Sequence, residues 1–242
     1  VVAAMGQMFY SLSIAMGILI TFGSYMKKET SLEDSTRNVE VFDTAIAIMA
    51  GLMIIPAVFA FSGGDPDTLQ AGPALMFITI PKVFENMGFG TVVGILFFLL
   101  VLFAAVTSSI ALTESAVSTF EDELGWSRRR ATVLVGVIMI ALGSLSSLGY
   151  GPLAGIKIIG MQFLDFFDFL TNSVMMPIAA MLTSLFVSRI VGMKRMEEEI
   201  MHGESTFRRK KIFIVMIKYL CPVFALIILI SSVANAFGWI AM

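Results

Sequence analysis

The chain has 242 residues, of which 57% are hydrophobic and 14% are charged, and its net charge is −2. The mean hydropathy of +0.91 and the low charged fraction differ from a soluble domain, in which about 25% of residues are charged. The composition therefore excludes a soluble module, and its charge indicates no nucleic-acid partner. The single cysteine, Cys221, excludes a disulfide or cysteine–metal framework.

Largely uncharged apolar stretches of about 20 residues recur along the chain, and each is long enough to cross a ~30 Å hydrocarbon core as a helix. Only helices and closed barrels satisfy their backbone groups in lipid, and the ten-residue alternation of a barrel is absent. These features predict an all-α, multi-pass protein of the cell membrane, with residues 1–242 forming a single transmembrane domain. The six predicted spans are residues 1–25, 41–61, 91–113, 131–148, 169–187 and 212–239.

Lysine and arginine are concentrated in the loops after the first, third and fifth predicted spans. The second and fourth loops hold only Lys82 and Lys157. The positive-inside rule therefore places the three basic loops in the cytoplasm and both ends of this sequence outside. The sequence begins at Val1 inside a hydrophobic segment, without a leader or cleavage site. This start predicts the C-terminal part of a longer transporter or channel.

Two loops carry local signals. The pattern Ser31-Leu-Glu-Asp34 resembles a capping box, which would start the second helix early and place Asp43 about three turns inside it. The second loop, residues 62–90, is long and rich in glycine and proline. It predicts an extracellular loop with short helices around residues 74–80 and 81–87.

The first predicted span is unusually polar at its centre, where FYSLSIAMG occupies residues 9–17. Small residues and serines are enriched where membrane helices pack closely. Alternatively, serine competes for backbone hydrogen bonds and glycine weakens a helix, so that the helix could break and free carbonyl groups for ion binding. The residues alone leave both interpretations open.

The third predicted span has small and hydroxyl side chains on one helical face, at Ala104, Thr107, Ser108 and Ala111. This face fits either a close helix contact or a site for a hard cation, which prefers oxygen ligands. Glu114 follows one to two turns later. A carboxylate at membrane depth needs a partner, and a structural hydrogen bond to another helix is the preferred interpretation.

Three aspartates allow two interpretations each. Asp43 is either an interfacial charge or a sodium ligand or proton carrier inside the helix. Asp165 and Asp168 lie three residues apart, either as an ionic gate or as a solvated helix start favoured by the dipole. His202 lies in a polar loop and is expected to be exposed. No phosphate loop, nucleophile elbow or metal-ligand spacing occurs in the sequence, so an enzyme is not expected.

Four runs of sequence resemble the neurotransmitter:sodium symporter family, and in particular its bacterial amino-acid transporters. They are GQMFYSLSIAMGILITFGSY, FDT at 42–44, LFAAVTSSIAL and FEDEL. The resemblance covers the whole chain and implies the sixth to eleventh helices of the leucine-transporter fold. It implies that sodium ions serve as coupling ions without another cofactor. The expected function is sodium-coupled symport of a hydrophobic or aromatic amino acid by alternating access.

The resemblance also implies roles for individual residues. The unwound centre of the first span would be Tyr10–Met16. The implied substrate-binding residues are Tyr10, Ser11, Ser13, Met16 and Leu112. The implied ligands of the first sodium ion are Ser11 and Asp43, and those of the second are Ala104, Thr107 and Ser108. The implied gate residues are Asp168 on the outer side and Tyr25 and Asp122 on the inner side.

The sequence departs from the family pattern at two residues. Asp43 stands where many members have asparagine, and Gln7 and Ser11 match positions near the chloride site, so a fixed charge at Asp43 would replace chloride. Met16 stands where several members have an aromatic residue, which implies a softer pocket.

The family's first five helices lie outside this sequence. They are expected partners, together with the lipid bilayer, the amino-acid substrate and sodium, because they would complete both sodium sites and the substrate site. The chain alone is therefore expected to hold half of each site and not to transport. The alternative is a membrane subunit or truncated remnant that only packs with other helices.

Overall fold

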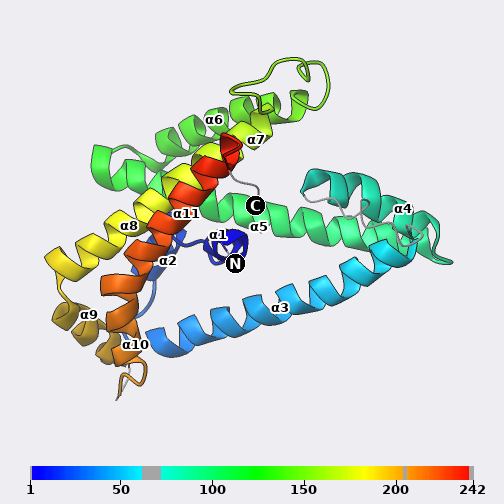
Figure 1. Ribbon diagram of the computed structural model, residues 1–242. Helices are drawn as coiled ribbons and strands as arrows, with labels where there is room; N and C mark the ends of the chain where they lie inside the picture. The colour runs from blue at the N-terminus through cyan, green and yellow to red at the C-terminus, as the bar shows by residue number, and fades with distance from the viewer. Residues whose placement is uncertain (1, 62–71, 204–205, 240–242) are drawn as a thin grey trace. The chain divides into compact units, whose positions relative to one another are not determined.

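The computed structural model describes residues 2–61, 72–203 and 206–239 (Figure 1). The regular elements in these ranges are helices, and an isolated bridge joins Ile158 to Met161. The chain divides into two compact units, one formed by Val1–Arg37 with Ala111–Met242 and the other by Asn38–Ile110. The predicted all-α fold is therefore confirmed in the described part of the chain.

Five of the described helices are long and apolar enough to cross a membrane. They are Leu32–Ala60, Gly90–Leu124, Arg128–Leu148, Phe163–Val191 and Lys210–Ala236. Each contains most of a predicted span and extends beyond it at one or both ends. The 35-residue helix Gly90–Leu124 is about 52 Å long at 1.5 Å per residue, so its last turns extend beyond a ~30 Å hydrocarbon core.

The first predicted span, residues 1–25, is not one continuous helix. It consists of α1, Val2–Ser11, and α2, Ile18–Ser24, separated by a non-helical segment. Of the two interpretations that the residues left open, the broken helix is the one observed, close to the unwound centre that the resemblance implies at Tyr10–Met16. The physical reason lies in the segment itself, which combines serine with residues in left-handed backbone conformations.

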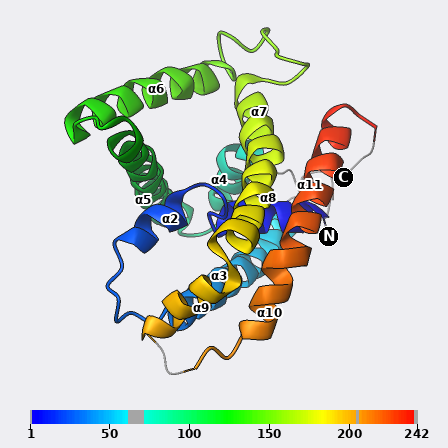
Figure 2. The same ribbon diagram turned by 90° about the vertical axis from the view of Figure 1, so that its left-hand side faces the viewer.

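The larger unit is built around two long helical segments. The first comprises α7, Phe163–Asp168, a π-helical segment and α8, Met176–Phe186; the second comprises α10, Lys210–Val215, a π-helical segment and α11, Cys221–Ala236. In both views α8 and α11 lie side by side (Figures 1 and 2). Ala180 of α8 and Ala225 of α11 are buried, and small residues of this kind let two membrane helices approach closely.

Further helices complete the larger unit. α1 contacts α11, and α6, Arg128–Leu148, contacts α7. α9, Met193–Ile200, follows a π-helical turn that ends at Gly192, whose φ of +86° suits glycine. A small buried cluster of Val117, Ala131 and Val135 joins α6 to the long helix α5, Gly90–Leu124.

Prolines account for three π-helical segments. Pro81, Pro177 and Pro222 each occupy the second residue of an α-helical segment that directly follows a π-helical one. The π-helical segments are Leu75–Thr79, Phe169–Met175 and Met216–Leu220. Proline lacks an N–H and its ring clashes with the carbonyl of the preceding turn. A locally wider helix accommodates this ring without ending the helix.

One of the carbonyls in the turn before such a proline accepts a hydrogen bond from the neighbouring helix. The buried hydroxyl of Ser184 in α8 donates a hydrogen bond to the carbonyl of Ile217, five residues before Pro222. In lipid, an unsatisfied carbonyl costs several kcal/mol, and serine side chains are among the groups that satisfy it. The Ser184–Ile217 bond therefore compensates for the donor that Pro222 lacks.

The smaller unit contains most of α3, Leu32–Phe61, the loop helix α4, Ile80–Glu85, and the first part of α5. The predicted helices around residues 74–80 and 81–87 are observed as one helical run from Leu75 to Glu85. Residues 62–71 of the predicted loop lie outside the described residues. Phe84 of α4 packs against Phe97 of α5, with their ring centroids 5.5 Å apart.

Much of the apolar side-chain surface is exposed in both units. Ile20, Leu52, Leu100 and Ile140 are examples with more than half of their area accessible. Soluble proteins rarely expose contiguous apolar patches of this kind. We therefore expect lipid or further helices to cover these helix faces.

Candidate functional site

The break in the first span comprises Leu12–Gly17. Ser13, Ala15 and Gly17 have φ values of 53°, 63° and 79°. A non-glycine residue in the left-handed region costs about 1–2 kcal/mol, and such strain persists only where the surrounding structure imposes it. Two strained residues within six positions therefore mark this break as a candidate site.

The break leaves several backbone carbonyl groups without a hydrogen bond from the described residues. α1 ends with Leu12 N–H bonded to Met8 O and Ile14 N–H bonded to Phe9 O, and α2 begins with Thr21 N–H bonded to Gly17 O. Between these bonds, the carbonyls of residues 12–16 accept no hydrogen bond from any residue that the structure describes. Carbonyl oxygens are ligands that suit sodium, and the C-terminal end of α1 adds a partial negative charge.

The predicted substrate residues are distributed over the break and one other helix. Tyr10 and Ser11 form the end of α1, so the unwound segment begins two residues later than predicted. Ser13 and Met16 lie in the break, and both are partly buried. Leu112 lies on α5, one turn before Ser115. The Ser115 hydroxyl lies only 2.7 Å from where a Cβ atom on Gly17 would stand.

The three residues predicted for the second sodium site lie together on α5, within the smaller unit. The Thr107 hydroxyl donates a 2.9 Å hydrogen bond to the Ala104 carbonyl, and Ser108 follows directly. All three are exposed. A hydroxyl oxygen keeps lone pairs that can bind a cation. The arrangement thus places two predicted oxygen ligands side by side on one helix turn.

Asp43 lies 11 residues after the first residue of α3, about three turns into the helix as expected. Ser31 precedes the helix, and its hydroxyl accepts a 3.0 Å hydrogen bond from Asp34 N–H, which confirms the predicted cap. Asp43 is partly buried and lies in the smaller unit, whereas Ser11 lies in the larger one. Their joint role in the first sodium site therefore stays a prediction.

A cluster of polar groups joins α2, α5 and α6. Tyr25 Oη donates a 2.7 Å hydrogen bond to Glu114 Oε1, and Arg128 binds the other oxygen of Glu114. Arg128 also contacts Glu121 at 3.2 Å. This confirms the preferred interpretation of Glu114, a hydrogen bond to another helix.

Sequence reasoning missed Arg128 as a partner of Glu114. A usable signal exists, since Glu114 and Glu121 are two turns apart on one face of α5, shortly before an arginine run. Asp122, predicted as an inner gate residue, is exposed on α5. Its gate role, like that of Tyr25, stays a prediction.

The aspartates predicted as an outer ionic gate lie on α7, Asp165 in its first turn and Asp168 at its last residue. Asp165 and Asp168 are both exposed, and Asn172 in the next turn donates a hydrogen bond to Asp168. Tyr150 precedes this helix; partial burial, and then the negative charge of Asp165, raise the pKa of its phenol. The contact of Asp168 is local to its own helix, so its gate role also stays a prediction.

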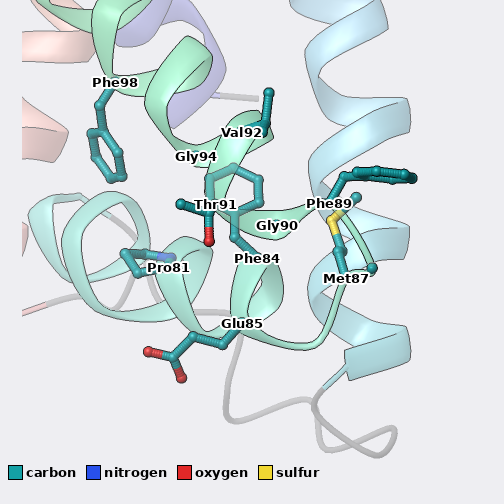
Figure 3. A pocket seen from close by; sticks show the side chains of 11 residues that line it. Pro81, Phe84, Glu85, Met87, Phe89, Gly90, Thr91, Val92, Gly94 and Phe98 are labelled. Atoms are coloured by element: carbon teal, nitrogen blue, oxygen red, sulfur yellow. The ribbon is translucent and has the colours of Figure 1, made fainter.

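A hollow of about 430 Å³ opens in the smaller unit between α4 and the start of α5 (Figure 3). Phe84 and Phe98 line it, with Glu85 and Met87 near its edge. Gly90 permits the close approach of the two segments, because a Cβ atom there would overlap the Phe84 carbonyl. The hollow contains none of the residues predicted to bind substrate or sodium.

Comparisons with known proteins agree on one family. The model of the sodium:neurotransmitter symporter family matches residues 1–238. An uncharacterised sodium-dependent transporter of Haemophilus influenzae is 33% identical over 229 residues, which is 94% of this chain and 49% of that protein. The uncharacterised sodium-dependent transporter YhdH of Bacillus subtilis is 32% identical over 202 residues, covering 84% of this chain and 44% of that protein.

A solved structure has the same fold. The crystal structure of MhsT in complex with L-phenylalanine matches with a TM-score of 0.84 and 37% sequence identity, over 96% of this chain and 51% of that one. The chain therefore spans about half the length of the relatives that it matches.

Proposed function

Because this chain belongs to the sodium:neurotransmitter symporter family, we propose that it supplies half of the substrate and sodium sites of a sodium-coupled amino-acid symporter. Members of this family are multi-pass membrane transporters and not enzymes. The proposed mechanism is alternating access around a site at the middle of the membrane. In this mechanism the break between α1 and α2 holds the ligands, and the helices around it move.

The observation that carries the proposal is the break at Leu12–Gly17, in which the carbonyls of residues 12–16 accept no hydrogen bond from the described residues. Backbone without hydrogen bonds is tolerated at membrane depth only where it is buried in protein or lines a polar cavity. A bound sodium ion and a substrate ammonium group would compensate for these carbonyls. Ser11 and Ser13, at the edge and inside of the break, would add hydroxyl oxygens.

The second sodium ion is proposed to bind at Ala104, Thr107 and Ser108. The carbonyl and two hydroxyls form a neutral set of oxygen donors, which is suited to a weakly held monovalent ion. Weak binding is required, because a coupling ion must also be released. The remaining ligands of both sodium ions, and groups for the substrate's charged ends, would come from helices outside this sequence.

The substrate is proposed to be a hydrophobic or aromatic amino acid. MhsT, which is 37% identical, was crystallised with L-phenylalanine. Tyr10, Met16 and Leu112 would contribute an apolar and adaptable lining, since methionine fills irregular space readily. Asp43 is proposed to provide the negative charge near the first sodium ion and so make chloride unnecessary.

A second candidate is a membrane subunit that packs with other helices without transporting. Small residues at the α8–α11 contact are compatible with it. The break favours transport, because helix packing alone gives no reason to strain Ser13 and Ala15 or to leave several carbonyls without a partner among the described residues.

The test is sodium-driven uptake by the full-length protein in liposomes. An inward sodium gradient is imposed, and accumulation is measured for labelled phenylalanine, leucine, glycine and glutamate. Uptake of phenylalanine or leucine above a matched potassium gradient supports the proposal. If the protein neither binds nor takes up any of these amino acids under a sodium gradient, the proposal is contradicted and the packing subunit is favoured.

A further inference from the structure

Lys218 lies inside a membrane-spanning helix, in the π-helical segment Met216–Leu220 between α10 and α11. It is the only charged residue of the sequence in residues 212–236. The apolar helix begins at Lys210, so Lys218 lies about 12 Å into it at 1.5 Å per residue. A charge at membrane depth is costly and needs a compensating partner.

Lys218 has no such partner in the part of the chain that the structure describes. Its side chain is exposed, and its ammonium group makes no hydrogen bond or ion pair with a described residue. Lys210 differs, because it forms an ion pair with Glu197 of α9. Lys211, the next residue, is exposed and also has no partner among the described residues. Two lysines of this helix are therefore available to a partner outside the described chain.

The two lysines lie on one exposed face of the helix. The exposed residues of the stretch 211–219 are Lys211, Ile212, Val215, Lys218 and Tyr219. They recur at intervals of three and four residues and so form one face, which we call the lysine face. The other residues of this stretch are partly buried, and the Ile217 carbonyl accepts a hydrogen bond from Ser184 of α8. The helix is thus held against α8, and the described residues leave the lysine face uncovered.

The lysine face has the composition of a surface that contacts lipid. Closely packed membrane helices carry small residues at their contacts, but the uncharged members of this face are the large residues Ile212, Val215 and Tyr219. The same row continues along α11 with further exposed apolar side chains, at Val223, Leu226 and Ile230. Lysines near a helix end extend their ammonium groups to the headgroup level, while their apolar stems stay beside the acyl chains. Cations at one end and an apolar row below them match a phospholipid.

The charged end of the lysine face lies on the side predicted to be cytoplasmic. Lys211 directly follows the basic loop that contains Arg208 and Arg209, and the positive-inside rule places this loop in the cytoplasm. The cytoplasmic leaflet carries anionic lipids, which attract lysine and arginine. The π-helical segment Val187–Val191 contacts the segment of Lys218 and adds the exposed Arg189. Charge complementarity therefore favours an anionic phospholipid over a zwitterionic one.

We propose that the lysine face binds an anionic phospholipid of the cytoplasmic leaflet. Lys211 and Lys218 contact its headgroup, and its acyl chains lie along the apolar row of α11. The bound lipid compensates for the charge of Lys218 at membrane depth. The lysine face contains none of the residues proposed to bind substrate or sodium, so this inference does not depend on the proposed transport function.

The experiment measures stabilisation of the full-length protein by lipid. The protein in detergent is titrated with phosphatidylglycerol at constant total lipid, the remainder being phosphatidylcholine with the same acyl chains, and its unfolding temperature is recorded. Lys218→Met removes the ammonium group and keeps an unbranched side chain, whereas Lys218→Arg keeps a cation. Lys194→Met is the matched control, because Lys194 is an exposed lysine of α9, outside the membrane-spanning helices.

Lys218→Met should raise the phosphatidylglycerol concentration for half-maximal stabilisation about fivefold, as expected for the loss of one cation at an anionic membrane surface. Lys218→Arg and Lys194→Met should leave this concentration unchanged. No shift for Lys218→Met, or an equal shift for Lys194→Met, would overturn the proposal. A lower unfolding temperature of Lys218→Met in pure phosphatidylcholine, with an unchanged titration, would also overturn it and pair Lys218 with a carboxylate on a helix outside this sequence.

Lys211→Met is the second variant, and it decides the question if Lys218→Met does not fold. Lys211 lies at the end of the membrane-spanning helix, where its replacement disturbs folding less. A shift of about fivefold supports the proposal, and an unchanged titration overturns it.

Discussion

Tyr25 and Glu114 are joined by a 2.7 Å hydrogen bond from the phenol to the carboxylate. Tyr25 follows the last residue of α2, and Glu114 lies on α5, where Arg128 from the start of α6 binds its second oxygen. One carboxylate therefore connects three helices. Because Arg128 and Tyr25 are 58% and 57% exposed, solvent screens both contacts of this carboxylate.

Removing the Tyr25 hydroxyl should weaken the attachment of α2. Tyr25→Phe is expected to lower the temperature of unfolding, because the Glu114 carboxylate loses the hydrogen bond from the phenol. The measurement is thermal unfolding of the full-length protein in detergent. Tyr219→Phe is the control, since the Tyr219 phenol is similarly exposed but makes no hydrogen bond to any residue that the structure describes. Equal unfolding temperatures for both variants would contradict the structural role of this bond.

The Ser184 hydroxyl should stabilise the protein, because it bonds a carbonyl that Pro222 leaves without a backbone donor. Ser184→Ala leaves the Ile217 carbonyl without its donor and is expected to destabilise the protein by about 1–3 kcal/mol. Ser188→Ala, whose hydroxyl bonds Leu185 O in its own helix at 3.2 Å, should have little effect.

A double-mutant cycle with Pro222→Ala tests the cause. The alanine restores a backbone N–H, so Ser184→Ala should cost less in that background. An identical cost in both backgrounds, measured by thermal unfolding, would show that the serine does not compensate for the proline.

The strained backbone of the break predicts that an alanine-to-glycine substitution changes stability in opposite directions in the break and in a regular helix. Ala15→Gly should stabilise the protein by about 1 kcal/mol, because Ala15 has φ of 63° and glycine adopts this conformation without a Cβ clash. Ala141→Gly in the middle of α6 should destabilise it by a similar amount. The measurement is the change in unfolding temperature of the two variants. A change in the same direction for both would contradict strain at Ala15.

The second sodium site predicts a change in ion affinity at one of two adjacent serines. Ser108→Ala should raise the sodium concentration for half-maximal uptake about tenfold, which corresponds to about 1.4 kcal/mol. Ser109→Ala should not, because its hydroxyl bonds Val106 O at 2.9 Å on another face of α5. Uptake at varied sodium concentration gives both values. An unchanged sodium dependence for Ser108→Ala would remove this site assignment.

The fixed charge at Asp43 predicts an effect on anion dependence. Asp43→Asn should lower sodium affinity or make uptake depend on chloride, because the positive charge of sodium would lose its compensating carboxylate. Uptake is compared in chloride and gluconate buffers. Asp34→Asn, in the exposed first turn of the same helix, is the control. If neither effect appears, Asp43 does not substitute for chloride.

The sequence by itself determined the class and most of the helices. Apolar stretches near 20 residues require helices in lipid, because no other local structure satisfies the backbone there. Local rules also predicted the Ser31 cap and the depth of Asp43 in α3, since both depend only on neighbouring residues. For Glu114, the cost of a carboxylate at membrane depth predicted a partner on another helix, which is Tyr25 together with Arg128.

Only the tertiary structure decided whether the first span breaks and which contacts position the α2 segment that follows the break. Serine and glycine are compatible with a close helix contact and also with a break. Which of the two forms depends on the helix that packs against them. Here Ser115 approaches Gly17 so closely that no side chain fits, and Thr21 finds its partners about 95 residues away in the sequence. Contacts over such distances depend on how helices pack, and the residue pattern within one helix does not contain that information.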